Sequence, residues 1–137
     1  MSQAGGCICG NVRYEVSGEP AMKALCHCGD CRKISGSSHS TNGVYPEAAF
    51  KLVQGTPKTH TKKADSGNDF VSFFCPDCGT TLWRESKTFE GLKVVKVGSL
   101  DDFEAFKSLT PAAELYASQR APWLSAVEGA KQADAMS

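Results

Sequence analysis

The chain has 137 residues, enough for one domain that buries roughly two-thirds of its unfolded surface. Hydrophobic residues make up 41% and charged residues 22%, which excludes wholesale disorder. Basic and acidic residues each number 15, so the net charge is zero and no basic field attracts nucleic acid. The first six residues lack the features of a secretory signal, and no apolar run reaches the roughly 20 residues that span a bilayer. We therefore expect a cytoplasmic protein with neither a membrane nor a nucleic-acid partner.

Short extended segments dominate the first part of the chain. Residues 12–16 alternate between apolar and polar side chains with period two, which predicts a half-buried strand, and residues 17–20 are typical of a turn. A second short strand, residues 22–25, is expected to lead into the next segment. Residues 29–34 could form a single helical turn that ends before a Ser-Gly pair.

The same pattern of short strands continues to the end of the apolar sequence. The predicted strands are 40–45, 50–54, 58–63, 70–74, 80–84, 92–97 as a central strand, and 113–117 as a final edge strand. Residues 124–137 have few apolar anchors, which predicts a loose helix or a disordered tail and limits the domain to residues 5–123. Many short strands with few helices predict an all-β domain of packed antiparallel sheets.

Seven cysteines fall in three tight clusters, Cys7-x-Cys9, Cys26-x-Cys28-x-x-Cys31 and Cys75-x-x-Cys78. Thiolates a few residues apart on a turn can converge on one tetrahedral Zn²⁺. A disulfide framework fits poorly, because such near neighbours would close very small rings and an odd total leaves one thiol over. Gly79 follows the last pair and is expected to take a positive φ, so that the preceding amides turn toward the sulfurs.

The seven thiols divide naturally into four and three, because structural zinc takes four protein ligands whereas catalytic zinc keeps one position open. Cys26, Cys28 and Cys31 are contiguous and can bind one metal as a tripod, which leaves the other four cysteines for a second metal. A competing interpretation adds His27 or His39 to the tripod as a fourth ligand and makes both sites structural.

The net charge of a zinc ion bound by the tripod favours a thiol substrate. Three thiolates leave a zinc complex with net charge minus one, which makes a weaker Lewis acid than zinc bound by imidazoles and one better suited to a soft sulfur. Arg32 and Lys33 could offset this charge or pair with a carboxylate of the ligand. The alternative is that both are exposed cations on a turn.

These motifs together resemble one known family. The residues that carry the resemblance are Gly5 to Tyr14 (GGCICGNVRY), Cys26 to Lys33 (CHCGDCRK), Ser35-Gly36, Phe74 to Thr80 (FCPDCGT) and Gly98 to Asp101 (GSLD). In order and spacing the sequence is similar, from about Gly5 to Trp123, to the glutathione-dependent formaldehyde-activating enzymes, a family that also includes centromere protein V.

The resemblance implies a β-tent, in which antiparallel sheets meet at an angle around zinc sites. It implies a structural zinc bound by Cys7, Cys9, Cys75 and Cys78. It implies a catalytic zinc bound by Cys26, Cys28 and Cys31. The activity it implies is that of a carbon–sulfur lyase joining a small thiol, glutathione, to formaldehyde as S-hydroxymethylglutathione. Function remains a separate question from fold, and a non-catalytic, zinc-stabilised module that binds a protein partner is the alternative.

Several other residues have two interpretations. The polar candidates for a general base near the tripod are His27, Asp30 and His39. The aromatic residues Phe73, Phe74, Trp83 and Trp123 are expected in the core. Asp101 and Asp102 are expected in a turn or as a helix cap rather than as a metal site. Exposed strand edges are compatible with a homodimer.

Overall fold

The computed structural model describes residues 1–64 and 66–136. Its strands are β1 (Ser2–Gly6), β2 (Arg13–Ser17), β3 (Met22–Cys26), β4 (Ser40–Pro46), β5 (Phe50–Gln54), β6 (Lys58–Lys63), β7 (Asp69–Phe74), β8 (Thr81–Ser86), β9 (Leu92–Lys96), β10 (Ala113–Leu115) and β11 (Lys131–Gln132). The α-helices are α1 (Gly29–Ser35) and α2 (Phe103–Lys107). The chain is therefore mainly β, as its sequence predicts.

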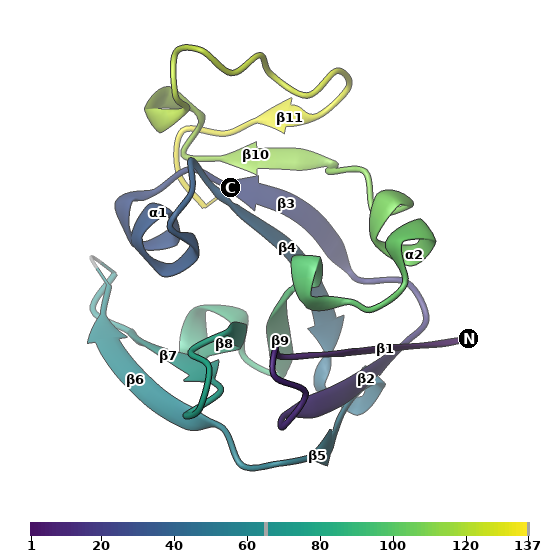
Figure 1. Ribbon diagram of the computed structural model, residues 1–137. Coiled ribbons are helices and arrows are strands. Elements are labelled where there is room, and N and C mark those ends of the chain that lie inside the picture. The colour runs from purple at the N-terminus through teal and green to yellow at the C-terminus, as the bar shows by residue number, and fades with distance from the viewer. Residues whose placement is uncertain (65, 137) are drawn as a thin grey trace.

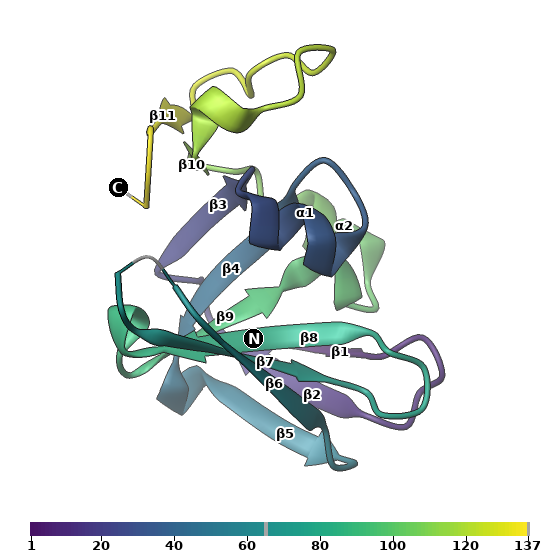
Figure 2. The same cartoon turned by 90° about the vertical axis from the view of Figure 1, so that its left-hand side faces the viewer.

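The strands form two sheets that meet at an angle. The smaller sheet has the order β1-β2-β5, and the larger has the order β11-β10-β3-β4-β9-β8-β7-β6. Figure 2 shows β3 and β4 at a steep angle to β6, β7 and β8, with β2 and β5 below these three strands. Neighbouring strands are antiparallel, except that β10 runs parallel to both β3 and β11. This arrangement is the expected β-tent.

Two hydrophobic clusters fill the fold, and each contains cysteines. The larger cluster surrounds Tyr14, Leu82 and Trp83, and it includes Cys7 and Cys75. The smaller cluster lies under α1 and β10. Its buried members are Ala24, Cys26, Cys31, Leu115 and Ala133. The buried cysteines of the two thiol groups therefore pack in different parts of the core, Cys7 and Cys75 in one and Cys26 and Cys31 in the other.

The end of the chain differs from the expected loose helix or disordered tail. Within residues 124–136 the structure has no helix, and β11 pairs with β10, so that β10 is not an edge strand as predicted. Main-chain hydrogen bonds secure this segment, including Ala133 N to Glu114 O at 2.9 Å and Lys131 N to Ala112 O at 2.9 Å. Because such bonds need no apolar side chains, the hydrophobic pattern gives no sign of them. The domain limits of residues 5–123 stay a prediction.

The sequence did not predict β1 or α2. The segment SQAGG that forms β1 is rich in glycine and lacks a strand pattern. Asp102 caps α2 by accepting a hydrogen bond from Glu104 N at 3.0 Å, as expected, whereas Trp123 is 76% exposed and does not belong to the core. No helix in the described part of the chain is long and apolar enough to cross a membrane.

Candidate metal centres and the adjoining pocket

The first candidate centre is formed by four cysteines from two turns that are distant in sequence. Cys7 and Cys9 follow β1, and Cys75 and Cys78 lie in the turn between β7 and β8. The four sulfurs lie within 4.8 Å of one another, with Cys7 Sγ 3.5 Å from Cys9 Sγ and Cys9 Sγ 3.7 Å from Cys75 Sγ. Tetrahedral zinc with Zn–S bonds of about 2.3 Å places its sulfurs about 3.8 Å apart, whereas a disulfide requires about 2.05 Å. The donor set therefore fits zinc.

The turns around this four-thiol cluster direct hydrogen-bond donors at its sulfurs. Val12 N donates to Cys7 Sγ at 3.2 Å, and Asp77 N donates to Cys75 Sγ at 3.4 Å. Gly79 has a φ of 80°, which confirms the predicted left-handed turn. Hydrogen bonds from the side chain and main chain of Thr80 lower the pKa of Cys78 to about 5. Donors of this kind favour the thiolate that a metal requires.

The second candidate centre is contiguous in sequence. Cys26 ends β3, Cys28 is the N-cap of α1, and Cys31 lies one turn later in the helix. Their sulfurs lie within 4.8 Å of one another, and Cys31 N donates to Cys28 Sγ at 3.4 Å. Hydrogen bonds from Cys26 and Cys28 lower the pKa of the Cys31 thiol. Hydrogen bonds with Cys28 and Cys31 raise the pKa of the Cys26 thiol. A cation among these three thiols would relieve this competition and let all of them ionise.

Neither histidine joins this three-thiol cluster in the described structure. His27 points away from the sulfurs, and its Nε2 atom lies 2.7 Å from Glu114 Oε1 in a site where both side chains are 1% exposed. His39 Nδ1 instead lies 2.8 Å from Ser38 Oγ, and its ring centroid lies 5.4 Å from that of His27. The three-thiol cluster thus has one ligand fewer than the four that tetrahedral zinc takes.

Lys96 on β9 is a functional candidate that sequence reasoning missed. Its Nζ atom donates to Asn42 Oδ1 at 2.6 Å on the neighbouring strand. Burial lowers the pKa of Lys96, while its attraction to the thiols of Cys31 and Cys26 opposes that decrease. Arg32 and Lys33 are exposed on α1, so Lys96 is the cation that offsets the charge of the thiols.

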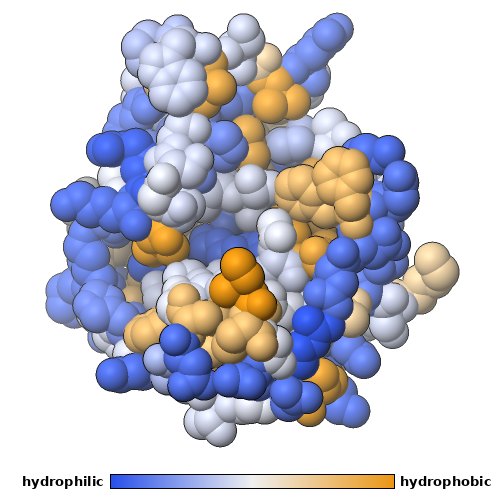
Figure 3. Space-filling model, in the orientation of Figure 1, coloured by the Kyte–Doolittle hydropathy of each residue, from blue (hydrophilic) through white to orange (hydrophobic). Residues whose placement is uncertain are grey.

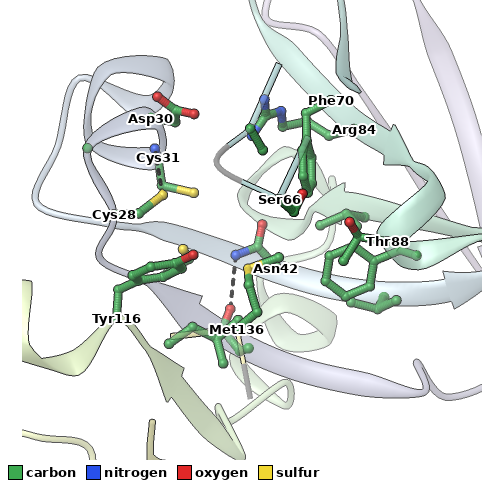
Figure 4. Close-up of a pocket in the computed structure, with 18 of the residues that line it drawn as sticks. Cys28, Asp30, Cys31, Asn42, Ser66, Phe70, Arg84, Thr88, Tyr116 and Met136 are labelled. Atoms are coloured by element: carbon green, nitrogen blue, oxygen red, sulfur yellow. Dashed lines mark hydrogen bonds between the residues drawn. The ribbon is translucent and has the colours of Figure 1, made fainter. Parts of the chain in front are cut away.

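All three cysteines of this cluster open onto a pocket of about 320 Å³. One face of the large sheet forms its floor, because residues two apart on a strand share a face and the strand registers align Ala24 with Asn42 and Asn42 with Lys96. Figure 4 shows Cys28, Cys31 and Asp30 on one side of the pocket and Phe70 and Arg84 on the other. The size is within the range of small-molecule sites.

The general-base candidates lie in three different environments. Asp30 lines this pocket, and Lys62 forms an ion pair with its carboxylate. His27 is buried against Glu114, and His39 lines a second cavity with Cys7 and Cys78.

Figure 3 shows the surface of the face seen in Figure 1. This face is hollowed near its centre, and hydrophilic residues lie in the hollow.

The protein is a cysteine-rich β-tent protein with two potential metal sites. Its sheets meet at an angle, one site is a complete four-thiol cluster, and the other is a three-thiol cluster on a pocket. Residues 2–119 match the family model described as glutathione-dependent formaldehyde-activating enzyme, and the chain belongs to this family. The family assignment confirms the resemblance seen in the cysteine motifs.

A solved structure agrees with this fold. The crystal structure of a Rhodobacter sphaeroides protein is 21% identical, with a TM-score of 0.56, and the match covers 72% of this chain and 87% of that one. At this identity the likeness shows the fold alone. No curated protein matches the chain.

Proposed function

We propose that this protein is a zinc-dependent carbon–sulfur lyase that acts on a small thiol–aldehyde adduct. The adduct that the family description suggests is S-hydroxymethylglutathione, formed from glutathione and formaldehyde. The observation that carries the proposal is a three-thiol cluster, one ligand short of a closed zinc site, in the wall of a pocket. A site needed only for rigidity has no use for an open position.

Each cluster has its own role in this proposal. The residues that would hold the catalytic zinc are Cys26, Cys28 and Cys31. The residues that would hold a structural zinc are Cys7, Cys9, Cys75 and Cys78. All seven cysteines are free thiols, which suits a reducing compartment such as the cytosol.

The catalytic zinc would supply a coordination position at which a substrate thiol ionises and an oxyanion is stabilised. The cation of Lys96, attracted to the same thiols, lowers the electrostatic cost of bringing a further anion into the pocket. Asp30 is the one general-base candidate that lines the pocket among the described residues, and Lys62 holds its carboxylate. We assign to Asp30 the proton of the incoming thiol, which Asp30 then returns to the carbonyl oxygen of the aldehyde, so that the S-hydroxymethyl product forms with no net proton exchange. The walls of the pocket hold thiol and aldehyde together, which favours formation of the carbon–sulfur bond.

The test compares two cysteine variants by native mass spectrometry and by turnover. The rate of adduct formation from glutathione and ¹³C-formaldehyde is measured by NMR. Cys28→Ser should keep the fold and one zinc but reduce the rate to the uncatalysed background. Cys78→Ser should lose the other zinc and destabilise the whole chain, since its cluster joins β1 to the β7–β8 turn. Unchanged turnover in Cys28→Ser would overturn the proposal.

The zinc count also distinguishes the lyase from a binding module. The enzyme should bind two zinc ions, one of which becomes labile or gains a glutathione adduct when glutathione is added. A single zinc ion that ignores glutathione would favour the non-catalytic module that binds a protein partner.

A further inference from the structure

The pocket beside the three-thiol cluster contains more positive than negative charge. Among the described residues that line it, the cations are Lys62, Lys63, Arg84 and Lys96, and the one carboxylate is that of Asp30. Lys62 forms an ion pair with Asp30, and Lys63 forms one with Asp69. The remaining two cations therefore determine what the pocket can bind.

Arg84 differs from the other three cations because, among the described residues, no carboxylate or thiol accompanies it. Its Nε atom donates to Ser72 Oγ at 3.0 Å, and its guanidinium carbon lies 4.9 Å from the ring centroid of Phe70. No acidic residue of the described chain forms an ion pair with it, although Arg84 is only 7% exposed. A buried cation without an anion is costly, so its position favours a negatively charged ligand.

The guanidinium of Arg84 is held in position and still has free donors. Ser72 and Phe70 fix its plane, whereas its two Nη atoms have no hydrogen-bond partner within the described residues. These atoms are not among the completely buried polar atoms, so they open onto the pocket that Arg84 lines. A planar fork with free terminal donors matches the two oxygens of a carboxylate.

Arg84 lies across the pocket floor from the three-thiol cluster, and the row of the floor level with Arg84 is apolar, formed by Val94, Val44 and Met22. The strand order places β4 and β9 between Arg84 on β8 and Cys26 on β3, so the two lie at opposite sides of this floor. A molecule that reaches both ends must therefore have a body that tolerates apolar surroundings.

We propose that Arg84 binds a carboxylate of the substrate, so that the pocket selects thiols carrying an acidic group at the end remote from the sulfur. The inference rests on the proposed function for the thiol end and names the class of substrate. Arg84 acts in this scheme as a residue that determines specificity. Lys96, engaged by Asn42 and the thiols, serves the opposite end of the pocket.

Hexanoate and 1-hexanol form a matched pair of probes, because they share an apolar chain and differ in the acidic group. Each is titrated into the full zinc-loaded chain by calorimetry, while NMR follows the Arg84 Nε–H resonance. Hexanoate should shift that resonance and bind at least about tenfold more tightly than hexanol, as expected for charge-assisted hydrogen bonds. Equal binding of the two probes, or an Arg84 resonance that does not move, would refute the inference without any variant.

Two variants and a control locate the effect. Arg84→Gln should remove the preference for hexanoate, and Arg84→Lys should restore part of it because it keeps the charge but not the fork. Lys63→Gln, which removes a cation already paired with Asp69, should change hexanoate affinity less than about twofold. An equal loss in Lys63→Gln and Arg84→Gln would mean that only the general positive field attracts the acid.

A comparison of 6-mercaptohexanoate with 6-mercapto-1-hexanol, whose chains are long enough to extend from the thiol cluster toward Arg84, separates this inference from the proposed function. The ratio of their kcat/KM values with formaldehyde should favour the acid and fall about tenfold in Arg84→Gln. If the wild type turns over both thiols and the ratio is the same in Arg84→Gln, the lyase stands and the role of Arg84 is wrong. If hexanoate depends on Arg84 but no thiol is turned over, the acid site stands and the lyase is wrong.

Discussion

Replacing Glu114 by Gln should destabilise the protein by roughly 3 kcal/mol. The buried carboxylate accepts hydrogen bonds from His27, Arg120, the main chain of Val127 and Gln132. Burial by itself raises the pKa of Glu114, but the bonds from Gln132, Val127, His27 and Arg120 outweigh it and lower that pKa from 4.5 to about 2. At about 1.4 kcal/mol for each pKa unit, this difference corresponds to the stated loss. An amide also presents an N–H group to donors on one side of the site, which leaves buried donors without an acceptor.

Urea unfolding at pH 7 in zinc-containing buffer measures this loss. The midpoint for Glu114→Gln should fall without a change in slope, because the area exposed on unfolding is the same. Glu104→Gln is the matched control, since the side chain of Glu104 is 74% exposed and pairs with Lys107 on the surface. That control should change stability by less than about 0.5 kcal/mol. A loss in Glu114→Gln of less than about 1 kcal/mol would refute the reasoning.

The pH dependence gives the same prediction a second test. The folded state lowers the pKa of Glu114, so its contribution is fully present above the unfolded value of 4.5 and is lost as the pH falls toward about 2. The stability difference between wild type and Glu114→Gln should therefore shrink below pH 4.5. Acid also releases metal from both proteins, and this loss of stability cancels when the stability of the variant is subtracted from that of the wild type. A difference that grows on acidification would contradict the assignment.

Three further predictions concern the backbone, a helix cap and the metals. Gly55→Ala should cost about 2–4 kcal/mol in urea unfolding, because Gly55 has a φ of 83° and a Cβ atom would lie 2.3 Å from the carbonyl oxygen of Asn11. Gly18→Ala, with a φ of 70° but open space around it, should cost less, and equal losses would exclude the close contact as a cause. Asp102→Ala should lower stability by about 1 kcal/mol in thermal unfolding through loss of the α2 cap on Glu104, and Asp102→Asn should retain most of it. A strong chelator should release zinc in two phases, the faster from the three-thiol cluster, and a single phase would argue against different sites.

Much of the fold is visible in the sequence because its strands are short and bounded by turn residues. Residues 12–16 alternate clearly, and β2 is found at Arg13–Ser17. The pattern gives less information for β8, where Leu82, Trp83 and Arg84 are all buried because both faces of the strand are covered. Alternation therefore does not indicate which side chain of this strand faces the pocket.

The candidate metal ligands were predictable for a different reason. Their spacing is a local property, so contiguous cysteines such as Cys26 and Cys28 are recognisable before the fold is known. Lys96 and Glu114 were not recognisable, since a charged residue within a strand usually indicates the solvent face. Their partners come from distant segments, and the contact of Glu114 with His27 depends on the parallel pairing of β10 with β3.

The two thiol clusters differ in how early they can assemble along the folding pathway. Cys26, Cys28 and Cys31 lie within six residues, whereas the other cluster needs Cys7 and Cys78 to meet across most of the chain. Local contacts form before distant ones, because closing a long loop costs more chain entropy. The unfolded chain can therefore bind metal through the local cluster, so this metal contributes less to native stability. The distant cluster binds metal far better in the native state than in the unfolded chain. Zinc at that cluster therefore reports on completed folding.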